Sequence, residues 1–281
     1  MKIKSVKKPV QFPELRGTLA SMRYPCFGEI KYDGEACYIH YNYNGHKATI
    51  VTTNKYGTMR YDWPKLDGLA EVLKKANVIQ ALFQAELYFG DGKAGSLYSL
   101  LSHKTDDNLN LAIFDVNYLV KNEGGNVEAI IEGNKTPLID RKELLGDIFK
   151  LNTCLTYPKL IASRTEAEEY FNAVISIGWE GVVLKQLDGF ATYGPCPWVK
   201  MKKKDQNVFE VRYVDPVKER IEIASITKDN GCTKVTAVGV KCCDKDKSGL
   251  EVGDKVIIEH QGILSSGSLR HPVFISKEGE Q

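Results

Sequence analysis

Several short stretches of the sequence place lysines and carboxylates where they could act on phosphate groups. The first is Lys31-Tyr32-Asp33-Gly34, which follows an apolar run at 27–30 and precedes an alternating run at 36–41. A lysine at the junction of two strands is held by backbone on both sides, which suits a nucleophile. On this stretch alone, a solvated turn lysine explains the pattern equally well.

Two carboxylates and a second lysine border apolar strands further along the chain. Glu86 lies at the end of an apolar strand, where a carboxylate is costly unless a cation or a hydrogen-bond donor meets it. Glu180 and Lys185 bracket a buried apolar run, and in a regular strand they would face opposite sides. Either one of them alone faces a cleft, or the strand is irregular. The simpler alternatives are a strand end in solvent for Glu86 and an edge salt bridge for the other two.

A basic strand follows at 197–204. Lys200 and Lys202 are two residues apart and share one face, where their ammonium groups repel unless an anion lies between them. A polyphosphate would meet this need. A solvated basic edge, or a nucleic-acid patch that includes Lys203 and Lys204, is the alternative.

Together these residues suit phosphoryl or nucleotidyl transfer, because carboxylates hold a divalent metal and lysines neutralise phosphate oxygens. The sequence contains no Gly-x-x-x-x-Gly-Lys motif, so it is not a P-loop enzyme. If Lys31 attacks phosphorus it must be neutral, which costs about 4–5 kcal/mol at pH 7. Neighbouring lysines and a metal would reduce that cost, whereas Asp33 would increase it if it were close.

The elements that position these residues indicate an α+β domain followed by an all-β domain. The spacing of apolar residues predicts a helix at 65–77, and N-cap signatures begin further helices at Asp140 and Thr165, the latter ending near Gly178. Predicted strands of the first domain are 26–31, 36–43, 47–53, 79–87, 109–116, 181–186 and 197–204. Short β-rich runs follow at 208–214, 220–227, 234–241, 255–260 and 272–276. They favour a small barrel or sandwich, with domains at 1–204 and 205–281.

Composition excludes several classes of protein. The chain has 281 residues, 43% hydrophobic and 26% charged, as is usual for a soluble protein. It has neither an apolar run of membrane-spanning length nor a secretory signal. The net charge of +2 restricts any nucleic-acid contact to local patches. Seven cysteines, without a Cys-x-x-Cys pair, indicate reduced thiols and a cytoplasmic location rather than disulfides or zinc.

In this order, the motifs resemble those of the covalent nucleotidyltransferase superfamily of DNA ligases, RNA ligases and capping enzymes. The motifs are Lys31-x-Asp-Gly, Glu86, Phe114-Asp115, Glu180-Gly-Val-Val-Leu-Lys185 and Trp198-Val-Lys-Met-Lys202. The C-terminal Gly267-Ser-Leu-Arg-His-Pro272 resembles ATP-dependent DNA ligases, especially the small bacteriophage type. The resemblance covers essentially the whole chain.

The resemblance implies a fold and a set of residue roles. It implies an ATP-grasp-like nucleotidyltransferase domain of antiparallel sheets and helices, then an OB-fold barrel, with a nucleotide cleft between them. Lys31 would carry AMP, Glu86 would bind ribose or metal, and Phe114 would stack on adenine. Glu180 would hold metal. The remaining implied nucleotide contacts are Glu29 and Ile30 near Lys31, Lys185 at the α-phosphate, and Lys200 and Lys202 at the phosphates.

The implied reaction is ATP-dependent sealing of nicks in duplex DNA, with Mg²⁺ or Mn²⁺, as used in DNA replication, repair and recombination. Lys31 attacks the α-phosphate of ATP, AMP passes to the 5′-phosphate, and the 3′-hydroxyl then displaces AMP. Positioning and charge neutralisation would carry most of the catalysis. A monomeric, virus-encoded or bacterial enzyme without membrane contact is expected.

The chain departs from the family pattern after the first hairpin. It has Thr53-Asn-Lys55-Tyr-Gly57 instead of Ser-Arg-x-Gly, so Lys55 or Arg60 would replace the usual arginine. Further DNA contacts are expected from Lys203, Lys204 and Arg270, and they would be salt-dependent.

Three alternatives remain open. An RNA ligase or a capping guanylyltransferase would use the same lysine chemistry, although no Arg-x-Asp-Lys motif is found near the end of the chain. An NAD-dependent ligase is not expected, because it would need an added N-terminal module and a cysteine cluster. A non-catalytic nucleic-acid-binding relative could keep the fold without the reaction.

Overall fold

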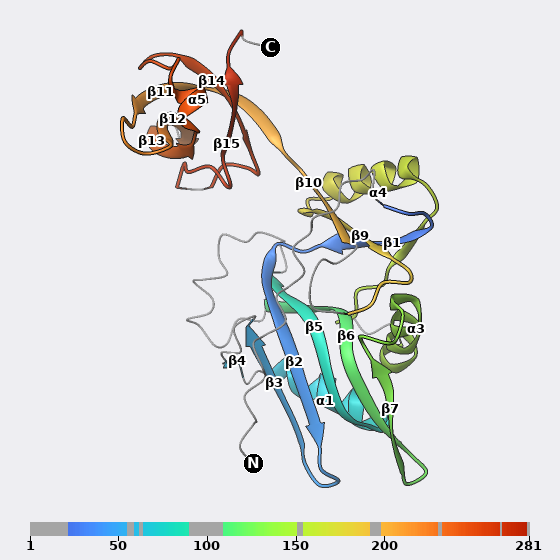
Figure 1. Cartoon of the computed structure of the whole chain (residues 1–281). Coiled ribbons are helices and arrows are strands. Elements are labelled where there is room, and N and C mark those ends of the chain that lie inside the picture. Colours follow the sequence, from blue (N-terminus) through green and yellow to red (C-terminus); the bar gives the residue numbers. More distant parts are fainter. Residues whose placement is uncertain are drawn as a thin grey trace. The chain divides into compact units, whose positions relative to one another are not determined.

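The computed structural model divides into two compact units that join between Met201 and Lys202 (Figure 1). The described residues are 22–54, 59–61, 64–89, 109–150, 154–191, 198–229, 232–264 and 266–279. Sequence analysis placed the boundary after Lys204. Each unit has a hydrophobic core of its own, as expected of separate domains.

The first unit is built on a six-stranded antiparallel sheet. In pairing order its strands are β4 (Met59–Tyr61), β3 (Ala48–Asn54), β2 (Gly34–Tyr43), β5 (Val78–Phe89), β6 (Leu109–Glu123) and β7 (Asn126–Glu132). Helix α1 (Pro64–Lys75) packs on β3 and β5, and α3 (Leu138–Phe149) packs on β6 and α1. Leucines of both helices enter the core of this sheet because they recur at helical spacing.

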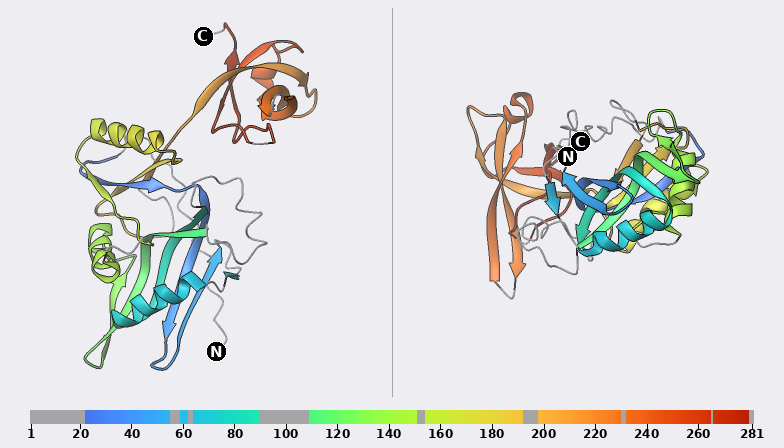
Figure 2. Two further views of the ribbon diagram at one scale, coloured as in Figure 1. Left: turned by 180° about the vertical axis from the view of Figure 1, so that it is seen from behind. Right: turned by 90° about the horizontal axis from the view of Figure 1, so that it is seen from below.

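A second, four-stranded sheet completes this unit (Figure 2). In pairing order its strands are β10 (Trp198–Lys202), β9 (Gly181–Gln186), β1 (Cys26–Lys31) and β8 (Lys159–Ile161). β1 is antiparallel to both β8 and β9. Helix α4 (Arg164–Ser176) packs on β1, β8 and β9, so a small separate core forms beneath it.

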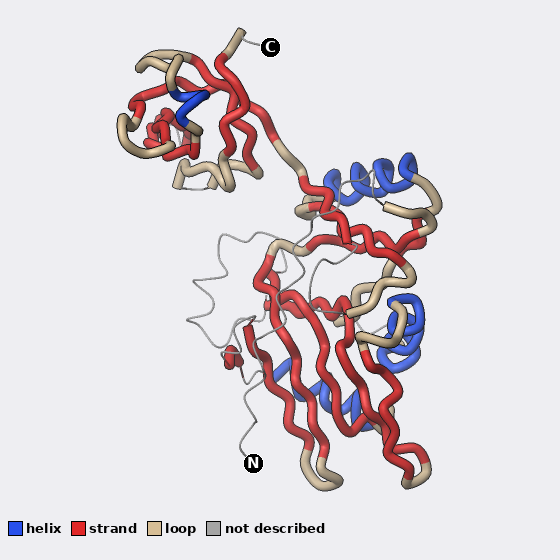
Figure 3. Tube along the Cα trace, in the orientation of Figure 1, coloured by secondary structure: helices blue, strands red, loops and turns tan. Residues whose placement is uncertain are grey.

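The predicted mixture of antiparallel sheet and a few helices is confirmed (Figure 3), but two helix starts were wrong. Helix α3 has Pro137 as its N-cap and Asp140 in its first turn. Helix α4 is capped by Ser163, whose side chain accepts from the Glu166 amide at 3.2 Å, not by Thr165. Glu166 returns the interaction by accepting from the Ala162 amide at 2.8 Å. These two bonds satisfy backbone donors at the start of α4 much as a capping box does, although Glu166 accepts from Ala162 and not from the N-cap residue Ser163.

Three strands were not predicted, namely β4, β7 and β8. β7 pairs with an extension of β6 that continues past the predicted end at Val116. Gly124 and Gly125, both with positive φ, form the turn between them. β7 is an edge strand with mostly exposed side chains, so it lacks the apolar alternation on which the prediction depended.

The second unit is a closed barrel, which decides between the predicted barrel and sandwich. In pairing order its strands are β11 (Asp205–Val214), β12 (Arg220–Asp229), β13 (Cys232–Lys241), β15 (Val273–Lys277) and β14 (Lys255–His260). β14 returns to pair with β11, and β13 and β15 are parallel. A one-turn helix that sequence analysis did not predict, α5 (Asp244–Lys247), follows β13. No helix in the described part of the chain has the length and apolar character needed to cross a bilayer.

Candidate active site

A cavity of about 230 Å³ lies between strands of the two sheets of the first unit. Among the residues that the structure describes, all those that line it belong to this unit. The lining includes all the predicted nucleotide-binding residues except Lys202, namely Glu29, Ile30, Lys31, Glu86, Phe114, Lys185 and Lys200. The structure thus gathers side chains from β1, β5, β6, β9 and β10 around one space.

Lys31 is the last residue of β1, and its ammonium group contacts a carboxylate just before β9, the strand that pairs with β1. β1 and β9 pair with Lys31 opposite Gly181, which brings Glu180 beside the lysine. Lys31 Nζ lies 2.5 Å from Glu180 Oε2 and 3.3 Å from the Tyr32 carbonyl oxygen. Glu180 precedes β9 rather than belonging to it. The alternation of side chains along a strand therefore does not separate Glu180 from Lys185.

Gly34 is needed for close strand pairing. It begins β2 and pairs with Tyr88 of β5. It is absent from the glycines with positive φ. A Cβ atom here would overlap the Leu87 carbonyl oxygen, so no larger residue fits without a shift of the backbone. The glycine allows β2 to approach the strand that carries Glu86.

Glu86 pairs with Ala36 across β2 and β5, and faces the cavity among charged groups. Burial raises the pKa of Glu86 to about 7, and the nearby carboxylates of Glu180 and Asp33 add to this. Lys31 and Lys200 oppose the shift. The structure therefore brings together both predicted metal-binding carboxylates, and it places them among lysines.

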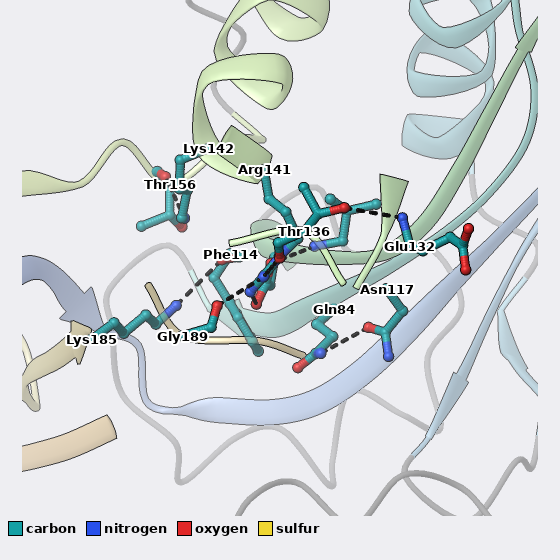
Figure 4. Close-up of polar contacts among 12 residues, drawn as sticks. Gln84, Phe114, Asn117, Glu132, Thr136, Arg141, Lys142, Thr156, Lys185 and Gly189 are labelled. Carbon is teal, nitrogen blue, oxygen red and sulfur yellow. Dashed lines mark hydrogen bonds and ion pairs between the residues drawn. The ribbon is translucent and has the colours of Figure 1, made fainter. Parts of the chain in front are cut away.

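Lys185 lies against two aromatic rings of the cavity. Its Nζ is 4.8 Å from the ring centroid of Phe114 and 4.2 Å from that of Trp198. It also donates to the Phe114 carbonyl oxygen at 3.3 Å (Figure 4). Such cation–π contacts are strongest where water is excluded, and the side chain of Lys185 is 2% exposed.

Glu29 is buried between two lysines, one of which sequence analysis missed. Its Oε2 lies 2.9 Å from Lys185 Nζ, and its Oε1 lies 2.8 Å from Lys142 Nζ. Lys142 comes from α3 and also donates to the Thr156 carbonyl oxygen at 3.3 Å (Figure 4). Burial lowers the pKa of Lys142 to about 8, Glu29 opposes the shift, and Lys185 adds to it.

The neighbour of Lys142 on α3, Arg141, holds the helix to the sheet. Its guanidinium donates to both carboxylate oxygens of Asp115 at 2.8 Å, and both side chains are fully buried. Arg141 also donates to the carbonyl oxygens of Thr136 and Gly189 at 2.6 and 3.0 Å (Figure 4). Although burial favours the neutral acid, Arg141 holds the pKa of Asp115 below its usual range.

A periodicity signal could have identified Arg141 and Lys142. Arg141 lies three residues after Leu138, and Lys142 lies three residues before Leu145. Both leucines are fully buried, so this helical spacing puts Arg141 and Lys142 on the buried face of α3. Sequence analysis interpreted Asp140 as the start of this helix and did not consider which face Arg141 and Lys142 would occupy.

An aromatic cluster, also missed, connects the segments that carry the charged groups. The Tyr32 ring lies 4.4 Å from that of Tyr88 and 5.1 Å from that of Trp179, between centroids. Tyr32 follows Lys31, Trp179 precedes Glu180, and Tyr88 lies two residues after Glu86. These rings therefore fix the three chain segments relative to one another.

The remaining predicted residues lie elsewhere or outside the described residues. Lys202 belongs to the second unit, where its Nζ lies 3.4 Å from Gln261 Oε1. Lys203 and Lys204 form ion pairs with Asp205 at 3.3 Å and Glu259 at 2.6 Å. The Arg270 backbone pairs with Gln261 and Gly262. Lys55 and the side chain of Arg60 lie outside the described residues.

Sequence comparisons place the chain among known proteins. The family model described as "ATP dependent DNA ligase domain" matches residues 9–202. DNA ligase 1 of Arabidopsis thaliana is 25% identical over 277 residues, which cover 90% of this chain and 33% of that protein. A DNA ligase of Sulfolobus acidocaldarius is 27% identical over 197 residues, covering 64% and 31%. The chain thus spans about a third of the length of these curated relatives.

Solved structures show the same fold at low sequence identity. A Lig E DNA ligase matches with a TM-score of 0.66 and 14% identity, covering 95% of this chain and 98% of that one. The ligase domain of Mycobacterium tuberculosis LigD matches with a TM-score of 0.53 and 18% identity, covering 96% and 95%. The first unit accordingly has the nucleotidyltransferase fold found in ATP-dependent DNA ligases.

Proposed function

Because the chain belongs to the ATP-dependent DNA ligase family, we propose that it seals 5′-phosphate/3′-hydroxyl nicks in duplex DNA at the expense of ATP. The family match covers well over half of the chain and confirms the resemblance noted from the motifs. The observation that carries the proposal is the placement of Lys31 in a cavity with Glu86, Lys185 and Lys200, in contact with Glu180.

Lys31 is the proposed nucleophile. Its Nζ attacks the α-phosphorus of ATP, a P–N bond forms, and pyrophosphate leaves with the bonding electrons. Before this attack the ammonium must lose a proton, and Glu180 Oε2 is within reach to accept it. Lys185 and Lys200 line the same cavity and neutralise charge on the phosphate oxygens.

The apolar and acidic side of the cavity is the proposed base site. Phe114 offers a ring face for stacking, and Trp198 stands nearby with its ring centroid 6.2 Å away. Glu29 lines this side and can only accept hydrogen bonds while it is ionised. It therefore suits the exocyclic amino group of adenine and not the carbonyl oxygen of guanine, which favours ATP over GTP.

Glu86 and Glu180 are the proposed ligands of Mg²⁺. In the described part of the chain no group of three or more acidic, histidine or cysteine side chains is arranged to hold a metal. Two carboxylates beside a phosphate site fit an ion that is usually bound by one or two carboxylates together with substrate phosphates. Burial raises the pKa of Glu86 and repulsion from Glu180 and Asp33 adds to the shift, so a bound cation would favour the ionised carboxylate. When bound, Mg²⁺ would stabilise negative charge on the phosphates.

The second unit is proposed to be an OB-fold that contacts DNA. Its strands follow the order first, second, third, fifth, fourth and close by pairing the fourth with the first. This order supports the five-stranded OB barrel, a common nucleic-acid-binding fold. Lys203, Lys204 and Arg270 are the proposed phosphate contacts. In the later steps AMP passes from Lys31 to the 5′-phosphate, and the 3′-hydroxyl then displaces AMP to form the phosphodiester.

Intact-protein mass spectrometry tests this function directly. Protein freed of bound AMP with pyrophosphate is incubated with Mg²⁺ and either ATP or GTP, and any adduct is mapped to a peptide. We expect an AMP adduct on Lys31 that is discharged by 5′-phosphorylated nicked duplex DNA.

Other outcomes would point elsewhere. A GMP adduct would favour capping chemistry, and discharge by nicked RNA alone would favour an RNA ligase. No adduct with either nucleotide would indicate a binding protein without catalytic activity.

A further inference from the structure

Two lysines share one buried carboxylate at the base side of the cavity. Glu29 and Lys185 are each 2% exposed and Lys142 is 4% exposed, counting side chains only. Lys142 and Lys185 approach different oxygens of Glu29, at 2.8 and 2.9 Å. A single carboxylate needs only one cation for neutrality, so one of the two lysines has a purpose beyond balancing Glu29.

The two lysines differ in their access to the cavity. Lys185 lines it and lies over the rings of Phe114 and Trp198. Lys142 does not line it, and its second contact is the carbonyl oxygen of Thr156 at 3.3 Å. Lys142 also follows Arg141, whose bidentate pair with Asp115 anchors α3 at this point. Lys142 is therefore fixed behind Glu29, whereas Lys185 borders the space in which a ligand would bind.

We propose that Lys142 is the permanent counter-ion of Glu29, and that it thereby leaves Lys185 able to turn from Glu29 to a phosphate oxygen of the nucleotide. This inference rests on the proposed function, because it takes the cavity to be the ATP site. Lys142 is a positioning residue: it contacts neither nucleotide nor metal and acts through Glu29 and Lys185.

The electrostatics of the site support this division of labour. A buried carboxylate that loses every cationic partner is strongly destabilised. Without Lys142, Lys185 would have to remain on Glu29, and its contact with a phosphate would come at the cost of an uncompensated buried charge. With Lys142 present, movement of Lys185 towards an anion also separates two adjacent cations, because both meet the same carboxylate; burial, with a further contribution from Lys185, lowers the pKa of Lys142.

The test compares single-turnover rates of enzyme–AMP formation at saturating ATP. The variants are Lys142→Met, Glu29→Gln/Lys142→Met and Glu29→Gln, with Lys135→Met as the control. Lys135 is an exposed lysine that pairs with Glu132 at 2.7 Å, away from the cavity lining. The thermal unfolding midpoint of each variant is measured in parallel.

We expect Lys142→Met to slow the maximal rate by at least about tenfold, the effect of a 1.4 kcal/mol higher barrier. In the double variant Glu29 is neutral and no longer holds Lys185, so its rate should return to that of Glu29→Gln. Lys135→Met should match the wild type. A general loss of stability would not produce this pattern of rates, because the rate at saturating ATP is measured on protein that its unfolding midpoint shows to be folded.

Two results would overturn the inference while leaving the proposed function intact: an unchanged maximal rate in folded Lys142→Met, or a double variant that stays well below Glu29→Gln. If Lys142→Met does not fold, the comparison of the double variant with Glu29→Gln still decides. If the wild type and Lys135→Met form no adduct on Lys31, the proposed function itself fails and the inference with it.

Discussion

At the residue scale, a variant of Lys31 distinguishes the proposed formation of enzyme–AMP from the final sealing step. In the proposed mechanism, only the formation and discharge of enzyme–AMP need the Lys31 amine. We therefore expect Lys31→Ala to form no AMP adduct and to seal no ordinary nick, yet to seal a nick whose 5′-phosphate already carries AMP. Adduct formation by mass spectrometry and sealing of both substrates on denaturing gels measure this. Sealing of an ordinary nick by the variant from ATP would rule out Lys31 as the nucleophile.

Glu86 makes folding stability depend on pH. The pKa of Glu86 rises from 4.5 to about 7 on folding. As pH rises between these values the unfolded chain loses this proton while the folded protein keeps it, so Glu86 lowers stability progressively, and fully above pH 7. Relative to Glu86→Gln, the wild type should lose at most on the order of 3 kcal/mol across this range. Urea unfolding of both proteins at several pH values measures the difference, and parallel stability profiles would contradict it.

Among the elements, β2 and β5 approach each other more closely than a side chain at Gly34 permits. A methyl group there meets the Leu87 carbonyl oxygen, so Gly34→Ala should separate the strands, lower the free energy of unfolding by about 2 kcal/mol or more, and slow adenylylation. The matched control is Gly68→Ala in α1, where nothing lies within 4 Å. It should stabilise the protein by up to about 1 kcal/mol. Equal effects of the two substitutions on urea unfolding would refute this account.

Helix α3 is attached to the sheet by a buried ion pair. Arg141→Met leaves the Asp115 carboxylate buried without its partner, which should cost about 3–5 kcal/mol in unfolding free energy. Asp115→Asn/Arg141→Met removes both charges and should recover part of the loss. Arg164→Ala, which removes an exposed ion pair with Glu168 on α4, serves as the control and should have no measurable effect. A loss no larger than that of the control would show that the buried pair contributes little to the attachment of α3.

Sequence alone predicted the elements whose apolar pattern is local. The bounds of β1, β9 and β14 agree with the prediction, because each is a short apolar run between turn residues. The edge strand β7 was missed because its pairing with β6 leaves most of its side chains in solvent.

Within the site, the sequence predicted the residues that line the cavity but not their contacts. The pairing of Lys31 with Glu180 spans 149 residues and depends on the register of β1 and β9. Lys142 was missed because a charged residue on a helix is normally solvated. Its burial becomes understandable only when Glu29, from another element, supplies the opposite charge.

At the scale of the whole molecule, two lysines near the start of the barrel already form ion pairs with carboxylates. Lys203 and Lys204 form ion pairs with Asp205 and Glu259, so a DNA phosphate that binds either lysine would compete with these carboxylates. If both lysines contact phosphates, Lys203→Ala/Lys204→Ala should reduce the slope of log K against log salt for nicked DNA by up to about 2.

The control for this prediction is Lys241→Ala, which removes a highly exposed lysine of the same barrel. Gel-shift titrations over a series of salt concentrations measure both slopes. Equal slopes for the two variants would exclude Lys203 and Lys204 from the DNA interface.

The order of strands in the small sheet also has a consequence during synthesis of the chain. β1 is translated well before both of its neighbours, β8 and β9. Until Gly181–Gln186 has emerged, β1 has two unpaired edges and Lys31 lacks the carboxylate of Glu180. The contact between Lys31 and Glu180 can therefore form only after most of the first unit has been translated. Before that point, the open edges of β1 are able to pair with strands of other chains.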